Sequence, residues 1–354
     1  MLELFLDKEF ANNYHLAFND KKDEYVEDFQ NDFIKKIQKL KLISNYLDKE
    51  DLMNQAKDNP LLELLIERIP KLVFSGDLLN EINSKEFPDT GSPFKLILTG
   101  QKTEICDFRR KRFGLEYLTP ANLSERWQLY YTRRSDINRK TTSDPAIPDE
   151  QRFDSWDKIK SFVHPLNSII LIDKYLLKWK TKKEFDKDIK NNILPIFNNL
   201  LLGGANETPI EIMIVSEFEE PSQKDKVELS QITLETRIKE NTMKIIHLNI
   251  LAYKKSSSNN ITPIHDRVII TNYFYIESGA GFKIFDNNGF RVTIETNTEI
   301  KFRSILNIQN VFSAFLDLKQ LGIYCQKKEN DSGRLDYVNF YPSKTNRLMN
   351  IEHF

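Results

Sequence analysis

The chain has 354 residues, of which 40% are hydrophobic, and this length predicts two domains rather than one. Its 51 lysine and arginine residues nearly balance 52 aspartate and glutamate residues, which leaves a net charge of −1 and excludes a bulk electrostatic attraction to nucleic acid or membranes. Any site for an anion must therefore be local.

The cysteine content and the apolar runs predict a cytoplasmic protein. Cys106 and Cys325 lie far apart without a metal-binding spacing, as in a reduced intracellular protein. The first residues lack the basic start and long apolar run of a signal peptide, and no stretch of about 18 apolar residues occurs that could span a membrane. We expect no membrane span and no cofactor.

The first half of the chain alternates short apolar strands with helical segments. Strands are predicted over residues 2–6, 71–76 and 94–100. Helices are predicted over residues 25–42 and 61–69, and a charged helix is expected to end at Arg112. This alternation predicts a Rossmann-like α/β domain over residues 1–131.

The end of this domain carries a strand that ends in Thr99-Gly100, a helix, and an apolar stretch over residues 114–120. This order resembles the end of PIN-like nuclease domains, in which an acidic metal ligand follows the Thr-Gly pair. The residue here is Gln101, whose neutral amide cannot supply the charge that Mg²⁺ or Mn²⁺ needs. The resemblance places Asp7 at the first metal-binding position. Alternatively, Asp7 only caps a strand.

A basic and aromatic stretch covers residues 108–140. Arginine can clamp phosphates and aromatic rings can stack on bases, so this stretch is a candidate for nucleic-acid binding. A solvent-exposed helix face would have a similar composition. The candidate residues are Arg109, Arg110, Arg112, Trp127, Arg133 and Arg134.

Residues 132–160 are predicted to be a linker or a long ordered loop, because residues 132–152 lack apolar periodicity. Residues 161–354 form the second predicted domain, and their Asn/Lys-rich tail is expected to be peripheral. Its predicted strands cover residues 168–175, which end in charge, 210–215 and 243–250, and its predicted helices cover residues 185–202 and 227–239. The predicted fold class is therefore α/β, with two domains that each have a mostly parallel central sheet flanked by helices.

Residues 264–282 predict a β-hairpin with a polar mouth. A β-branched strand leads to a turn at Asn272, and an aromatic strand then leads to Ser278 and several small residues. Strand alternation places the side chains of His265 and Arg267 on one face and that of Asp266 on the other. An imidazole and a guanidinium on the same face predict a site for an anion.

The spacing His265-x-Arg267-x-x-x-x-Asn272, followed by Ser278-Gly279, resembles the His-x-Lys-x-x-x-x-Asp and Gly-Ser signature of the phospholipase D-like superfamily. Two of the three signature positions are altered. The hairpin also resembles the non-catalytic phospholipase D-like module that follows MIT domains. The superfamily's activity implies a histidine that attacks a phosphodiester without a metal. Since each chain supplies one signature, activity would require a homodimer.

Two hypotheses about function follow. In the first, the protein binds phosphate or nucleic acid in a bacterial conflict or antiphage system, where two nuclease-related folds typically occur in one chain. Metal-independent phosphodiester cleavage by a homodimer is its enzymatic form. In the second, the protein is a non-enzymatic adaptor that binds a protein partner through the second domain. The candidate residues for the site are His265, Arg267, Asn272 and Ser278.

Overall fold

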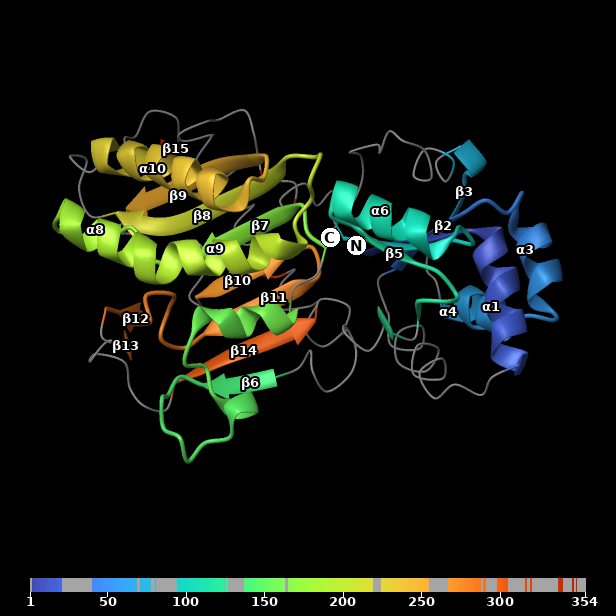
Figure 1. Ribbon diagram of the computed structural model, residues 1–354. Helices are drawn as coiled ribbons and strands as arrows, with labels where there is room; N and C mark the ends of the chain where they lie inside the picture. The colour runs from blue at the N-terminus through green and yellow to red at the C-terminus, as the bar shows by residue number, and fades with distance from the viewer. Residues whose placement is uncertain are drawn as a thin grey trace.

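The described residues of the computed structural model are 2–20, 40–68, 71–77, 80, 94–123, 125–126, 137–162, 165–218, 224–254, 267–287, 289–290, 298–304, 316, 319, 337–339, 346 and 348. They form two large β-sheets that lie side by side with helices packed against them (Figure 1). We call residues 2–126 the first half of the chain and residues 137–348 the second half. The predicted α/β fold with two helix-flanked sheets is confirmed.

The first sheet is parallel throughout, with the strand order β3-β2-β1-β4-β5. Its strands are β1 (Leu2–Leu6), β2 (Leu40–Ser44), β3 (Lys71–Phe74), β4 (Lys95–Leu98) and β5 (Glu116–Leu118). The prediction of a helix over residues 25–42 is wrong at its end, because residues 40–42 belong to β2. Residues 21–39 lie outside the described residues. Pairing of β2 with β1 along the whole strand decides the conformation there.

Helices cover both faces of the first sheet. They are α1 (Lys8–Asp20), α3 (Lys49–Ala56), α4 (Pro60–Arg68) and α6 (Thr103–Phe113). Successive residues of a strand point to opposite faces. Leu4 and Leu6 accordingly share an apolar cluster with side chains of α1, α3 and α4, whereas Phe5 packs with Cys106 and Phe113 of α6. Burial on both faces explains why β1 and β4 read as continuous apolar runs.

The second sheet is mixed, with the strand order β15-β9-β8-β7-β10-β11-β14-β6. Its strands are β6 (Ile137–Lys140), β7 (Ser168–Ile172), β8 (Ile210–Phe218), β9 (Ile246–Lys254), β10 (Val268–Thr271), β11 (Phe274–Ser278), β14 (Glu299–Ser304) and β15 (Tyr337–Asn339). Only β7, β8 and β9 pair in parallel, as predicted. The expectation of a mostly parallel sheet fails for the remainder, because a tight hairpin such as β10–β11 can only join antiparallel neighbours.

The helices of the second half lie against this sheet (Figure 1). They are α8 (Lys182–Asp188), the π-helical η4 (Ile189–Ile193), α9 (Leu194–Leu200) and α10 (Lys224–Thr242), with short 3₁₀ turns at η2 (Asp149–Gln151), η3 (Trp156–Phe162) and η5 (Leu201–Gly203). A two-stranded sheet joins β12 (Phe285–Asp286) and β13 (Gly289–Phe290). No helix within the described stretches is long and apolar enough to cross a membrane.

Two segments of the second half are more integrated than predicted. Residues 132–160, expected to be a linker or long loop, contribute the edge strand β6 and the buried side chains of Phe153, Trp156 and Ile159. The tail, expected to be peripheral, contributes β15 and the buried Asn346, whose Nδ2 donates to the carbonyls of Ile169 and Glu211 at 3.1 Å. The strands of these two segments pair with β14 and β9 in the second sheet, although the polar composition of the segments does not predict strands.

The two halves join through buried contacts between the turn of the β10–β11 hairpin and the amino ends of β4 and β5. The hydroxyl of Tyr273 donates to the Lys95 carbonyl at 2.5 Å and accepts the Glu116 N–H at 2.8 Å. Asn167, before β7, donates through Nδ2 to the Phe113 carbonyl at 3.2 Å. Buried apolar side chains of both sheets form one contiguous cluster.

Candidate functional site

Three strand ends meet at the carboxyl edge of β7 in the second sheet. Asp173 follows the last residue of β7, and Arg267 directly precedes β10, whose first residue pairs with Ile172. Ser278 ends β11, which runs antiparallel to β10 and therefore ends at the same edge. In open α/β sheets the carboxyl ends of the parallel strands are where ligands bind. Residues about 90 positions apart in the sequence thus become neighbours.

A cluster of cations surrounds the ring of Tyr175 at this edge. The charged groups of Lys174, Lys178 and Arg267 lie 4.7, 5.2 and 5.3 Å from the ring centroid. We call these four residues the Tyr175 cluster. Tyr175 is 42% exposed, so the cluster faces solvent. A hydrogen bond from Lys174, together with the positive charges of Lys174, Arg267 and Lys178, lowers the pKa of Tyr175, which indicates a locally positive potential.

A buried carboxylate and a tight loop hold this edge together. Asp173 accepts the N–H groups of Tyr175 and Phe282, each at 2.8 Å, while Arg267 donates through Nη1 to the Gly279 carbonyl. Gly281 has a φ of +81°, and a Cβ there would lie 2.9 Å from Oδ2 of Asp173, so the loop can close only with glycine. The pKa of Asp173 is raised, because the effect of burial outweighs these two hydrogen bonds and the positive charges of Arg267 and Lys283, which act to lower it.

The cations at this edge differ in their partners. Lys178 pairs with Glu217 at 3.2 Å, and Lys283 pairs with Asp188 at 2.9 Å. Burial lowers the pKa of Lys283 to about 8, although Asp173 and Glu184 act in the opposite direction. By contrast, neither Lys174 nor Arg267 forms an ion pair with any carboxylate among the described residues. These two cations are the best placed to attract an anion.

The structure brings only part of the predicted catalytic set to this edge. His265 lies outside the described residues. Ser278 is buried and its hydroxyl donates to the Gly281 carbonyl at 2.5 Å, so it shapes the loop. Asn272 lies at the other end of β10, about 16 Å from Arg267 at roughly 3.3 Å per residue.

Asn272 forms structural hydrogen bonds in the protein interior. It is fully buried, and its Oδ1 accepts the N–H groups of Asn167 and Ser168, each at 3.0 Å. Its Nδ2 donates to Oδ1 of Asn167 at 2.8 Å. The side chain therefore fastens the hairpin turn to the segment that enters β7 and lies away from the Tyr175 cluster.

Asp7 directly follows β1, the central strand of the first sheet, and links the ends of both neighbouring strands. Its Oδ1 accepts the Glu9 N–H and Nδ2 of Asn45, while its Oδ2 accepts the Thr99 hydroxyl and the Gly100 N–H, all at 3.1–3.3 Å. Across the described residues, no group of three or more His, Cys, Asp or Glu side chains could hold a metal ion. Gln101 accepts a hydrogen bond from Arg109. These contacts are the ones expected if Asp7 only caps the end of β1, which is the alternative to metal binding.

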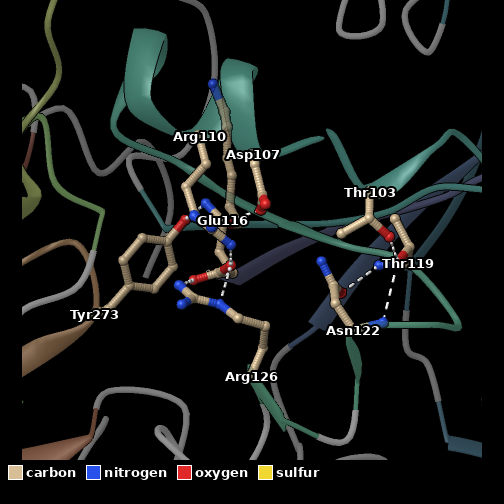
Figure 2. A network of polar contacts seen from close by, with 9 residues as sticks. Thr103, Asp107, Arg110, Glu116, Thr119, Asn122, Arg126 and Tyr273 are labelled. Carbon is tan, nitrogen blue, oxygen red and sulfur yellow. Dashed lines mark hydrogen bonds and ion pairs between the residues drawn. The ribbon is translucent and has the colours of Figure 1, made fainter. Parts of the chain in front are cut away.

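The described arginines of the basic and aromatic stretch contact groups of the protein itself. Figure 2 shows Arg110 and Arg126 pointing toward the carboxylate of Glu116, with contacts of 3.4 and 2.8 Å. Arg110 also pairs with Asp107 at 2.6 Å, and Arg112 pairs across the junction with Glu207 at 2.7 Å. Trp127, Arg133 and Arg134 lie outside the described residues. Of the contacts described, the Arg112–Glu207 pair is the one that joins the two halves.

The residues missed from sequence were Lys174, Tyr175, Lys178 and Lys283. The first three follow the apolar strand that the sequence predicts to end in charge, so the motif Asp-Lys-Tyr-x-x-Lys at a carboxyl edge is the signal that could have found them. Comparison of the chain with protein-family models and with curated proteins found no match. The geometry of the Tyr175 cluster is thus the basis for an assignment of function.

Proposed function

We propose that the protein binds the phosphates of a single-stranded nucleic acid at the Tyr175 cluster. The observation that carries this proposal is the gathering of Lys174, Lys178 and Arg267 around one exposed aromatic ring. Basic side chains combined with aromatic rings are typical of surfaces that bind single strands, because the cations follow the phosphate backbone. The chain's net charge of −1 means that this attraction is local.

Each residue of the cluster has a role that follows from its contacts. The guanidinium of Arg267 is oriented by its bond to the Gly279 carbonyl, and its planar fork suits a phosphate group. Lys174 adds a second positive charge, 4.7 Å from the centroid of the Tyr175 ring. Tyr175 positions both cations through cation–π contacts, each worth about 0.5–1 kcal/mol at an exposed site.

The contacts favour binding over hydrolysis. Asn272 and Ser278 are engaged in structural hydrogen bonds, which leaves Arg267 as the described member of the phospholipase D-like signature that faces the site. Hydrolysis by a homodimer would use His265 of one chain as the nucleophile and His265 of the other chain to protonate the leaving group. A protein that holds phosphodiesters without cutting them would suit the antiphage role as a sensor of foreign nucleic acid.

Fluorescence anisotropy with a short labelled single-stranded oligonucleotide tests the proposal. Lys174→Ala and Arg267→Ala should each weaken binding about tenfold, equivalent to roughly 1.4 kcal/mol. Each substitution should also lower the slope of log K against log salt by about one, because one phosphate contact is lost. The matched control is Lys57→Ala, which removes an exposed cation of the first half whose described contact is Asn54.

Equal affinity in the wild type and both cluster variants would overturn the proposal. The same incubations, followed by gel analysis with and without EDTA, separate binding from hydrolysis. Binding predicts an intact oligonucleotide in both cases. Cleavage that resists EDTA and disappears in His265→Ala would instead support the homodimeric phosphodiesterase, because that chemistry needs the histidine and no metal.

A further inference from the structure

A second positively charged site lies between the two halves, at the opposite edge of the second sheet from the Tyr175 cluster. It is a pocket of about 380 Å³ that the first half lines with Arg110, Lys111 and Arg126. The second half lines it with Gly204, Asn206 and Lys244, among others. Lys244 precedes β9, so the pocket adjoins the amino ends of the parallel strands. Every titratable side chain among the described lining residues is a cation.

Lys244 is the residue that most clearly lacks a negative partner. Its ammonium donates to the Gly204 carbonyl at 2.8 Å and to Oδ1 of Asn206, which are both neutral acceptors. No carboxylate among the described residues pairs with it, and burial lowers its pKa. Holding a partly buried cation against neutral groups alone costs free energy that a bound anion would recover.

The first-half wall of the pocket adds further positive charge in a fixed arrangement. Arg110 and Arg126 converge on the fully buried Glu116, and Arg110 also pairs with Asp107, so these two carboxylates hold both guanidinium groups in place (Figure 2). Lys111, on the exposed side of α6, contributes another ammonium group to the lining. Its carbonyl accepts the Asn206 N–H at 2.9 Å, which fixes one wall against the other.

We propose that this pocket binds the phosphate groups of a small ligand with the size of a mononucleotide, and that the ligand connects the two halves. A volume of about 380 Å³ lies within the range of small-molecule sites and is too small for a folded partner. Cations from both walls would surround a phosphate, where charge-assisted hydrogen bonds are strong. The inference is independent of the proposed function, because the two sites share no residue.

Isothermal titration calorimetry of the full chain with inorganic pyrophosphate and with ADP tests this inference. Lys244→Gln and Lys111→Gln should each weaken binding about tenfold or more, as expected for the loss of one charge-assisted hydrogen bond. Lys111 is exposed, so its variant is expected to fold normally. The matched control is Lys57→Ala, an exposed cation outside both sites, which should leave binding of both probes unchanged.

The probes also separate two sources of the phosphate. Equal affinity for pyrophosphate and ADP would indicate recognition of phosphate alone, whereas tighter binding of ADP would indicate a nucleotide. The inference is overturned if neither probe binds or raises the melting temperature at millimolar concentration. It is also overturned if Lys244→Gln and Lys111→Gln bind both probes as tightly as the wild type does. A third contrary outcome is that these two substitutions weaken only the binding of a single-stranded oligonucleotide.

Discussion

At the scale of the residue, Asn272 occupies a position where an aspartate would complete the phospholipase D-like signature. The folded chain uses both ends of its amide, since Oδ1 accepts two backbone N–H groups while Nδ2 donates to Asn167. An aspartate would keep the two acceptor contacts but would direct an oxygen at Oδ1 of Asn167. Asn167 cannot turn its amide without losing the bond from its Nδ2 to the Phe113 carbonyl.

We therefore predict that Asn272→Asp destabilises the protein by about 1–3 kcal/mol, the cost of a buried polar contact that has become unsatisfied. The free energy of unfolding, measured in urea, checks this. Asn287→Asp is the control, because Asn287 is exposed and the change should cost less than about 0.5 kcal/mol. Equal stability of the two variants would show that the amide of Asn272 has no special role.

At the scale of the element, the junction depends on how α6 ends. Gly114 terminates α6 with a φ of +64°, and its N–H donates to the Arg110 carbonyl at 2.9 Å. The left-handed conformation turns the chain sharply into β5. It also brings the glycine against the backbone before β7, because a Cβ at this position would lie 2.2 Å from the Leu166 carbonyl oxygen.

Gly114→Ala should lower the free energy of unfolding by about 2 kcal/mol or more, since a left-handed alanine is strained and its methyl group would collide with backbone. Gly76→Ala is the matched control, because no atom lies within 4 Å of a Cβ there and φ is not positive. Urea unfolding of both variants measures the difference. A small loss at Gly114 would mean that the two halves can separate at this contact with little cost.

At the scale of the whole molecule, one hydroxyl connects the hairpin of the second sheet to two strands of the first. Tyr273 is fully buried, and its hydroxyl contacts the Lys95 carbonyl and the Glu116 N–H. Its removal leaves both backbone groups without this partner. Glu116 also holds Arg110 and Arg126, so the same strand end supports the pocket between the halves.

Tyr273→Phe should destabilise the protein by about 1–3 kcal/mol and should speed hydrogen exchange at the Glu116 amide. Tyr46→Phe is the control, because the buried Tyr46 hydroxyl has no hydrogen-bond partner among the described residues and its removal should be neutral or slightly stabilising. Thermal unfolding and amide exchange of both variants provide the comparison. Unchanged exchange at Glu116 in Tyr273→Phe would contradict a role in joining the halves.

The sequence by itself determined the elements whose signal is local. The apolar runs of β1, β4, β7 and β8 predicted buried strands, the periodicity of α4 and α10 predicted helices, and the turn at Asn272 predicted the β10–β11 hairpin. These features arise from the preferences of neighbouring residues, which a single sequence displays directly. The presence of Arg267 in a candidate anion site followed from the same local pattern.

Tertiary structure alone decided which of these segments pair and which side chains meet. Antiparallel pairing of β10 with β7 places Arg267 beside Tyr175 and sends Asn272 to the opposite edge, although spacing had grouped it with Arg267. Pairing also recruits β6 and β15 from polar segments. Such contacts join residues far apart in the chain, so their free energy depends on the assembled sheets and leaves no periodic trace in the sequence.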